Sequence, residues 1–176
     1  GGPGPARTGS GTGTEPDADA VPVAGEAYVD VYRETIPSVV LVRTYGQAAG
    51  QGSGFVTDGG HVLTNDHVVA DAGAIRVGFR GGGWRAATVA GTDPYSDLAA
   101  LRVPERPSSA SPLSFVRSDP PVGTPVVALG APFALAGTAS AGVISGQDRS
   151  LDAGSGFAVP DAVQTDAAVN PGNSGG

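Results

Sequence analysis

Ser174 is the candidate nucleophile of this sequence, because it stands in a glycine-rich pentapeptide, Gly-Asn-Ser-Gly-Gly, at residues 172–176. Glycine adopts backbone conformations that are closed to other residues, so such a loop can direct consecutive N–H groups toward one point. A hydrolase needs that arrangement to hold the oxyanion of a tetrahedral intermediate beside its nucleophile. Taken alone, the pentapeptide fits a flexible glycine and serine linker equally well.

The search for a general base is short, because the chain has two histidines, His61 and His67. His67 lies at the end of an apolar run, where its side chain can face a cleft between two units. A half-buried structural histidine is the competing interpretation. His61 follows an Asp-Gly-Gly turn signal and is interpreted as a hairpin residue. A metal site of both histidines with Asp66 lacks the His-x3-His spacing and any thiolate, so we expect no metal.

Asp97 is the candidate partner of the imidazole. It stands directly before the strand-like run Leu-Ala-Ala-Leu at residues 98–101. A carboxylate at that position can lie in the crevice, accept the imidazole N–H and thereby select one tautomer. The alternative is that Asp93 or Asp97 only caps the turn around Pro94.

The chain order of these residues separates two types of hydrolase. The pentapeptide also matches the G-x-S-x-G elbow of α/β-hydrolases, but in that fold the acid and the histidine follow the serine. Here both partners precede Ser174, in the order His, Asp, Ser of the chymotrypsin arrangement. No alternation of strands and helices is visible either, which also argues against the α/β-hydrolase fold.

The segments that must position these residues are short and strand-like. Six runs separated by turn signals occur at residues 38–45, 54–57, 61–64, 74–79, 84–91 and 98–103. This spacing predicts a small antiparallel barrel. After the barrel come three more runs, at residues 124–130, 139–146 and 162–165. The sequence therefore predicts an all-β protein whose second unit has about half the strands of the first.

The remaining segments divide the chain into four parts. Residues 1–23 contain too little apolar surface to offset the entropy of ordering, so we predict a flexible tether. Apolar residues at helical spacing over residues 25–36, stopped by Pro37, predict a short helix that packs on the domain. The helix and first barrel then occupy residues 24–103, a Pro- and Ser-rich connector 104–121, and the second unit 122–176.

Deleting residues 1–23 is expected to change the melting temperature little, because a tether makes few contacts that unfolding would break. Differential scanning fluorimetry of the two forms measures the difference. A drop of many degrees would show that the segment packs on the barrels.

Composition and charge exclude some partners. Glycine and proline together account for 44 residues (29 plus 15) of 176, which favours many short strands and turns over long helices. The net charge is −7, and no basic stripe exists that could neutralise phosphates, so a nucleic-acid partner is not expected. Without cysteine there are no disulfides, and this does not argue against export.

Five sequence blocks closely resemble those of the HtrA/Deg family of serine proteases. Three are its catalytic blocks: Thr-Asn-Asp-His-Val-Val at residues 64–69, Asp-Leu-Ala-Ala-Leu at 97–101 and Gln-Thr-Asp-Ala-Ala-Val-Asn-Pro-Gly-Asn-Ser-Gly-Gly at 164–176. Two others look like its landmarks: Gly-Ser-Gly-Phe-Val at 52–56 and Leu-Gly-Ala-Pro-Phe at 129–133. The blocks occur in the family's order, and the match runs from about residue 38 to residue 176.

The resemblance implies a chymotrypsin-like fold of two antiparallel β-barrels, with the active site between them and no cofactor. It implies that His67 is the general base, that Asp97 orients the His67 imidazole and that Ser174 is the nucleophile. The N–H groups of Gly172 and Ser174 would form the oxyanion hole. Asp166 also matches a family motif, and we interpret it as a structural acid that supports a turn or accepts hydrogen bonds.

The sequence departs from the family after the nucleophile. Family members carry several more strands there, usually followed by one or two PDZ domains. Those strands would complete the second barrel, bind the substrate backbone and form one wall of the specificity pocket, so we expect a chain ending at Gly176 to be inactive or nearly so. The wall that is present, Ala168, Val169 and Asn170, is small and partly apolar, which favours cleavage after small aliphatic residues.

The resemblance implies ATP-independent cleavage of unfolded or damaged proteins. It also implies an extracytoplasmic location, with the protein either exported or membrane-anchored. Any targeting segment would lie upstream of Gly1. A homo-oligomer and a downstream PDZ domain remain open. Two other functions also remain open: a non-catalytic chaperone or peptide-binding module with a protease-like fold, and an esterase or lipase. The presence of all three candidate catalytic residues argues against the binding module, and the esterase would need residues downstream of Ser174.

Overall fold

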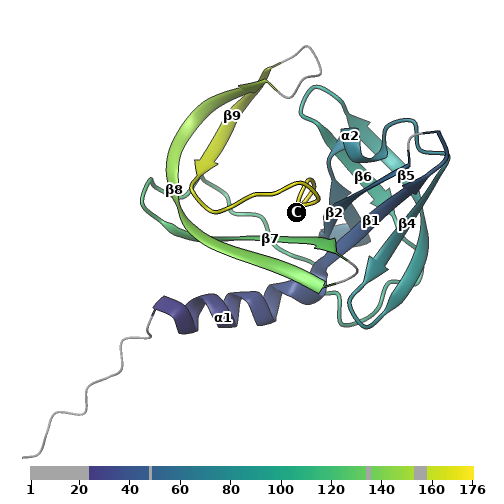
Figure 1. The fold of residues 1–176 in the computed structure, drawn as a ribbon, viewed down its shortest axis with the longest axis horizontal. Helices are drawn as coiled ribbons and strands as arrows, with labels where there is room; N and C mark the ends of the chain where they lie inside the picture. The colour runs from purple at the N-terminus through teal and green to yellow at the C-terminus, as the bar shows by residue number, and fades with distance from the viewer. Residues whose placement is uncertain (1–23, 48, 134–135, 153–157) are drawn as a thin grey trace, which may run out of the picture.

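The computed structural model of the protein describes residues 24–47, 49–133, 136–152 and 158–176. The predicted tether of residues 1–23 lies outside these ranges. Strands dominate the described residues, and Figure 1 shows them in two units, a barrel and a curved open sheet, with the C-terminal loop lying between them. The prediction of an all-β fold is therefore confirmed.

The first unit is a closed antiparallel barrel in the strand order β1-β2-β3-β6-β5-β4. Its strands are β1 (Val39–Tyr45), β2 (Gly50–Val56), β3 (His61–Thr64), β4 (Ala74–Phe79), β5 (Gly83–Asp93) and β6 (Leu98–Arg102). Two short 3-10 helices, η1 (Ile36–Ser38) and η2 (Asp58–Gly60), precede β1 and β3. The six predicted strands are confirmed, although β2 begins earlier than residue 54. Its first residues are glycine and polar, and they extend because they pair with β1 from Gly50 opposite Thr44 to Ser53 opposite Leu41.

Strand β1 is buried on both faces because it lies between the barrel interior and the second unit. Val40 and Val42 belong to the barrel core. Val39 and Leu41 instead pack with Ala131 of β7 (Pro125–Phe133) in a second apolar cluster. A strand covered on both sides carries a continuous apolar run rather than an alternating pattern. This packing brings β7 against the barrel and so fixes how the two units meet.

The second unit is a three-stranded antiparallel sheet in the order β7-β8-β9. Strand β8 (Ala136–Asp152) is much longer than the predicted run of residues 139–146, and β9 (Ala158–Thr165) begins earlier than residue 162. The added part of β8 is polar and shows no strand-like composition. It is extended because it pairs with β9, with several register shifts along the pair. Figure 1 shows this part of β8 curving away from β7. The described strands form an open sheet, so the prediction of an incomplete second barrel is confirmed.

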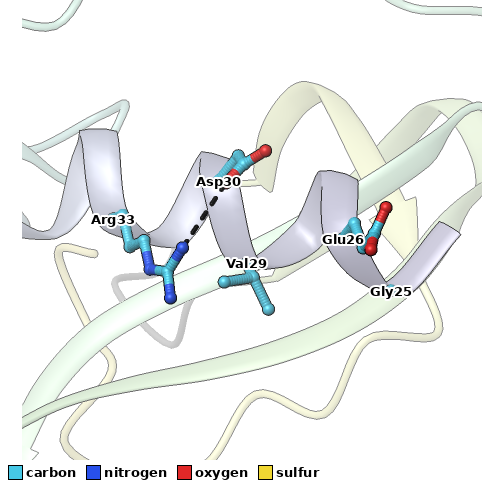
Figure 2. Close-up of a pocket in the computed structure, with 5 residues that line it drawn as sticks. All are labelled: Gly25, Glu26, Val29, Asp30 and Arg33. Carbon is cyan, nitrogen blue, oxygen red and sulfur yellow. Dashed lines mark ion pairs between the residues drawn. The ribbon is translucent and has the colours of Figure 1, made fainter. Parts of the chain in front are cut away.

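The predicted N-terminal helix is confirmed as α1 (Ala24–Thr35), and its C-terminal half holds it on the protein. The Tyr32 hydroxyl donates to the Gly137 carbonyl at 3.2 Å and accepts from Arg80 Nη1 at 3.1 Å. Figure 2 shows Gly25, Glu26 and Val29 of this helix near an exposed ion pair of Asp30 and Arg33. Such an exposed pair contributes little to stability. Among the described residues, no helix has the length and apolar character needed to span a membrane.

Candidate active site

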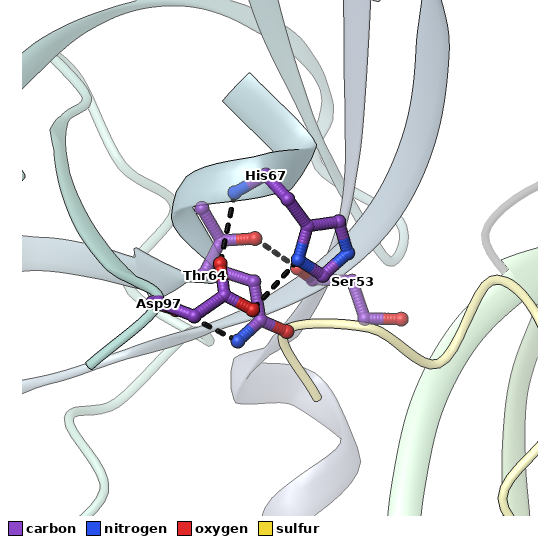
Figure 3. Close-up of polar contacts among 5 residues, drawn as sticks. Ser53, Thr64, His67 and Asp97 are labelled. Atoms are coloured by element: carbon purple, nitrogen blue, oxygen red, sulfur yellow. Dashed lines mark hydrogen bonds and ion pairs between the residues drawn. The ribbon is translucent and has the colours of Figure 1, made fainter. Parts of the chain in front are cut away.

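His67 is presented by a short helix, α2 (Asp66–Val69), which the sequence did not predict. The His67 backbone N–H donates to Asp97 Oδ1 at 2.9 Å, and His67 Nδ1 lies 2.7 Å from Asp97 Oδ2 (Figure 3). An ionised carboxylate can only accept hydrogen bonds, so this contact places the imidazole proton on Nδ1. His67 Nε2 is then left as a proton acceptor, which is the state that a general base requires.

Asp97 is held against α2 by its backbone as well as by its side chain. Its carbonyl oxygen accepts from Asn65 Nδ2 at 2.8 Å and from the Asp66 N–H at 3.1 Å. Asp97 has a φ of 51°, in the left-handed region that costs a non-glycine residue on the order of 1–3 kcal/mol. The hydrogen bonds to its carbonyl and its carboxylate hold it in that conformation. The side chain of Asn65 was not singled out from the sequence, although it stands within the block of residues 64–69.

Asp93 is the residue that caps the turn around Pro94. Its Oδ1 accepts the N–H groups of Tyr95 at 3.1 Å and Ser96 at 3.4 Å. A hydrogen bond from the Ser96 side chain, together with these backbone N–H groups, lowers the pKa of the Asp93 carboxyl. Two acids four residues apart therefore have different structural roles, because Asp93 stabilises the turn and Asp97 contacts the imidazole.

Ser174 lies in the C-terminal loop, which returns from β9 to the barrel. Ser174 and His67 line the same pocket of about 200 Å³, together with Val68, Gly50 and Gln51. Among the described residues, no hydrogen bond joins the Ser174 hydroxyl to His67. Catalytic hydrogen bonds are often long without substrate, so this does not argue against a nucleophile and base pair. The structure thus gathers His67, Asp97 and Ser174 at one place between the two units.

The backbone of the loop around Ser174 turns tightly, with a left-handed glycine and two hydrogen bonds within the loop. Gly172 has a φ of 96°, which favours glycine. The Asn173 N–H donates to the Asn170 carbonyl at 3.0 Å, and the Gly176 N–H donates to the Asn173 carbonyl at 2.8 Å. The N–H groups of Gly172 and Ser174 donate to no acceptor in the described part of the chain.

A second, smaller pocket of about 100 Å³ lies beside the loop. It is lined by Ala128, Thr138, Ala139, Ser140, Ala168, Asn170 and Asn173. Two of the three residues predicted for the specificity pocket, Ala168 and Asn170, are in this set. Val169 is not among them and is 63% exposed.

His61 and Asp166 lie outside the proposed catalytic group. His61 begins β3, and its carbonyl accepts the Thr57 N–H at 2.9 Å, which closes the hairpin between β2 and β3. Asp166 Oδ1 accepts the Val143 N–H at 2.7 Å, in agreement with its interpretation as a structural acid. No group of acidic or histidine side chains suited to a metal ion occurs in the residues that the structure covers.

The most informative residue that sequence reasoning missed is Ser53 of β2. It is fully buried, and its N–H donates to the Ser174 carbonyl at 2.7 Å. Its hydroxyl donates to the Gly172 carbonyl at 2.8 Å. Ser53 lies in the glycine-flanked landmark at residues 52–56, but a buried serine there gives no local sign that its partner is far along the chain.

Known proteins resemble this chain in sequence and in fold. The trypsin-like peptidase domain family matches residues 52–176. The serine protease PepD of Mycobacterium tuberculosis is 40% identical over 162 residues, which is 83% of this chain and 35% of PepD. A probable periplasmic serine endoprotease, DegP-like, of Chlamydia pneumoniae is 44% identical over 130 residues, 73% of this chain and 26% of that protein. This chain therefore spans about a third or less of the length of these curated relatives.

Among solved structures, the crystal structure of Deg5 superposes with a TM-score of 0.75 at 33% sequence identity. The match covers 86% of this chain and 78% of the Deg5 chain. The similarity in fold therefore extends over most of this chain.

Proposed function

Because this chain belongs to the trypsin-like peptidase family and, within it, to the HtrA/Deg proteases, we propose that it is a serine endopeptidase with Ser174 as its nucleophile. One observation carries the proposal: His67 Nδ1 contacts Asp97 Oδ2 at 2.7 Å while His67 and Ser174 line the same pocket. A nucleophile, a base and a group that orients the base are the parts that acyl transfer by serine requires.

In the proposed reaction, the Ser174 oxygen attacks the carbonyl carbon of the scissile peptide bond, and His67 Nε2 takes the hydroxyl proton. The carbonyl oxygen becomes the negatively charged oxygen of the tetrahedral intermediate. It accepts hydrogen bonds from the N–H groups of Gly172 and Ser174. His67 gives its proton to the departing amine as the C–N bond breaks, which leaves an acyl-enzyme. Water then attacks the acyl carbon with His67 again as the base, releasing the acid and restoring the serine. Asp97 holds the Nδ1 proton and stabilises the imidazolium.

We propose unfolded or damaged polypeptides as substrates, cleaved after small aliphatic residues. The small pocket beside the nucleophile loop supports this choice, because its volume of about 100 Å³ admits only a small side chain. The alanines at 128, 139 and 168 make part of its wall apolar, and Thr138, Ser140 and Asn170 make the rest polar. An extracytoplasmic location, exported or membrane-anchored, is supported by the likeness to a periplasmic relative. Residues 1–176 by themselves should have little activity, since the described sheet β7-β8-β9 is open and leaves the backbone groups of an edge strand unpaired.

The proposal is tested by incubating the full-length protein with a fluorophosphonate probe and, separately, with unfolded casein. We expect the probe to label Ser174, as located by mass spectrometry of peptides, and the casein to be cleaved without ATP. A folded protein of similar size, offered as the control substrate, should remain intact. If casein aggregation were suppressed with neither labelling nor cleavage, the protein would instead be a binding module with a protease-like fold.

A further inference from the structure

We propose that Ser53 is a positioning residue for the oxyanion hole, acting from β2 through the carbonyl groups of the nucleophile loop. Ser53 touches no reacting atom, so its effect on the reaction would be indirect. The inference rests on the proposed function, because it assigns a role in the same active site.

The hydrogen bonds of Ser53 join three parts of the protein that are distant in sequence. Its hydroxyl donates to the Gly172 carbonyl at 2.8 Å and accepts from the Ala131 N–H at 2.8 Å. Its backbone N–H donates to the Ser174 carbonyl at 2.7 Å, and its backbone carbonyl accepts from Thr64 Oγ1 at 2.7 Å. Figure 3 shows the residue beside Thr64 and close to the C-terminal loop. Ser53 therefore connects the loop to β3 and to β7 at once.

The direction of the Ser53 hydroxyl is determined by these contacts. A serine hydroxyl has a single proton to donate. The Ala131 N–H can only donate, so it occupies a lone pair of the Ser53 oxygen, and the hydroxyl proton is left for the Gly172 carbonyl. Since Ser53 is 0% exposed, bulk water does not compete for either bond.

Holding these two carbonyls sets the orientation of the loop N–H groups. Each peptide unit is planar, so a bond to the Gly172 carbonyl fixes the plane that joins Gly172 to Asn173. The bond to the Ser174 carbonyl fixes the plane after Ser174 in the same way. The Ser174 N–H belongs to the peptide unit between these two planes, and the carbonyl of that unit accepts from the Gly176 N–H. In a trans peptide the N–H points opposite to the carbonyl, so the Ser174 N–H points away from Gly176.

The loop needs such an external constraint because its glycines do not restrict it. Gly172 and Gly175 have φ values of 96° and 87°, and glycine reaches other peptide orientations at little cost. The contact with Ser53 is also close: a Cβ atom added to Gly175 would clash with the Ser53 carbonyl oxygen. One added to Gly52 would lie 2.9 Å from the Ser174 carbonyl oxygen. The loop backbone thus rests directly on β2, and Ser53 supplies the polar contacts there.

Ser53→Ala in the full-length protein is expected to lower kcat for a peptide substrate by about 10²-fold, with KM within about twofold, because one misdirected oxyanion donor costs about 10²–10³-fold. The inhibition constant of a peptide boronic acid, whose tetrahedral adduct occupies the oxyanion hole, should rise by a similar factor. The Kd of an uncleaved peptide, measured with Ser174→Ala present in both backgrounds, should stay within about twofold. If Ser53 only stabilised the fold, its loss would not change kcat and the boronic acid inhibition constant while leaving the peptide Kd unchanged.

Ser38→Ala is the matched control. Ser38 is also a buried serine next to β1, and its hydroxyl donates to a backbone carbonyl, that of Ser111, away from the nucleophile loop. Its loss should lower the melting temperature to a similar extent as Ser53→Ala and leave kcat and the boronic acid inhibition constant within about threefold of the parent protein.

The outcomes separate this inference from the proposed function. If the unchanged protein neither reacts with a fluorophosphonate nor cleaves the peptide, the proposed function is wrong. If it does both and Ser53→Ala has a kcat within threefold of Ser38→Ala, only the role of Ser53 is wrong. Should Ser53→Ala fail to fold, Ser53→Cys and Ser38→Cys take the place of the alanine pair, since a thiol is similar in size but a weak donor. We expect at least a tenfold lower kcat for Ser53→Cys than for Ser38→Cys, and equal values would overturn the inference.

Discussion

Ser174→Ala is expected to lower the turnover of a peptide substrate by the full-length protein about 10⁴-fold or more, and to abolish labelling by a fluorophosphonate. The substitution removes the oxygen that forms the acyl-enzyme, so only binding and the oxyanion hole remain to assist attack by water. The folded structure should persist, because the described contacts of Ser174 with the protein are made by its backbone, above all the carbonyl that accepts from Ser53. Steady-state kinetics and gel detection of the probe measure the two effects.

The control for this variant is Ser150→Ala, which removes an exposed hydroxyl on β8. Its turnover and labelling should equal those of the unchanged protein, and the melting temperatures of all three forms should agree within a few degrees. Labelling that persisted in Ser174→Ala would refute the assignment of the nucleophile.

His67→Ala is expected to lower turnover by a comparable factor, about 10⁴-fold, whereas His61→Ala should keep most of the activity. His67 contacts Asp97 and shares a pocket with Ser174, so its loss removes the proton acceptor from the reaction. His61 instead contributes its backbone carbonyl to the hairpin between β2 and β3, and alanine retains that group. Values of kcat/KM for the two variants, measured at the same pH, give the comparison.

The two histidine variants control for each other, because each removes one imidazole from the first barrel. Circular dichroism and melting temperature establish that both are folded before the rates are compared. An equal loss of activity in two folded variants would point to a ligand site shared by His61 and His67, and the assignment of His67 as the sole base would then be wrong.

The sequence by itself determined the elements whose cause is local. Apolar runs bounded by turn residues predicted all six strands of the first barrel, because a half-buried strand needs that composition wherever it lies. Helical spacing ending at Pro37 predicted α1. The glycines around Ser174, and the order of His67, Asp97 and Ser174, were enough to propose a nucleophile with its base and acid, since the chemistry needs those residue types whatever the fold.

Only the tertiary structure decided the features that depend on distant partners. The polar half of β8 is extended because β9 pairs with it, and no residue within that half predicts this. In the sequence, Asp93 and Asp97 are equally suited to cap the turn. In the structure, α2 provides two N–H groups and an imidazole as hydrogen-bond partners to Asp97. Val169 is exposed, whereas Ala168 and Asn170 line the small pocket beside the nucleophile loop.

Ser53 is the clearest case, because its hydroxyl and the Gly172 carbonyl that it contacts are 119 positions apart in the chain. Hydrophobic periodicity and turn composition report on neighbours a few residues away, and they contain no information about which buried polar groups will meet. A buried hydroxyl must find a partner wherever the fold brings one within reach. That partner is set by how the barrel and the second sheet come together, and therefore by the tertiary structure alone.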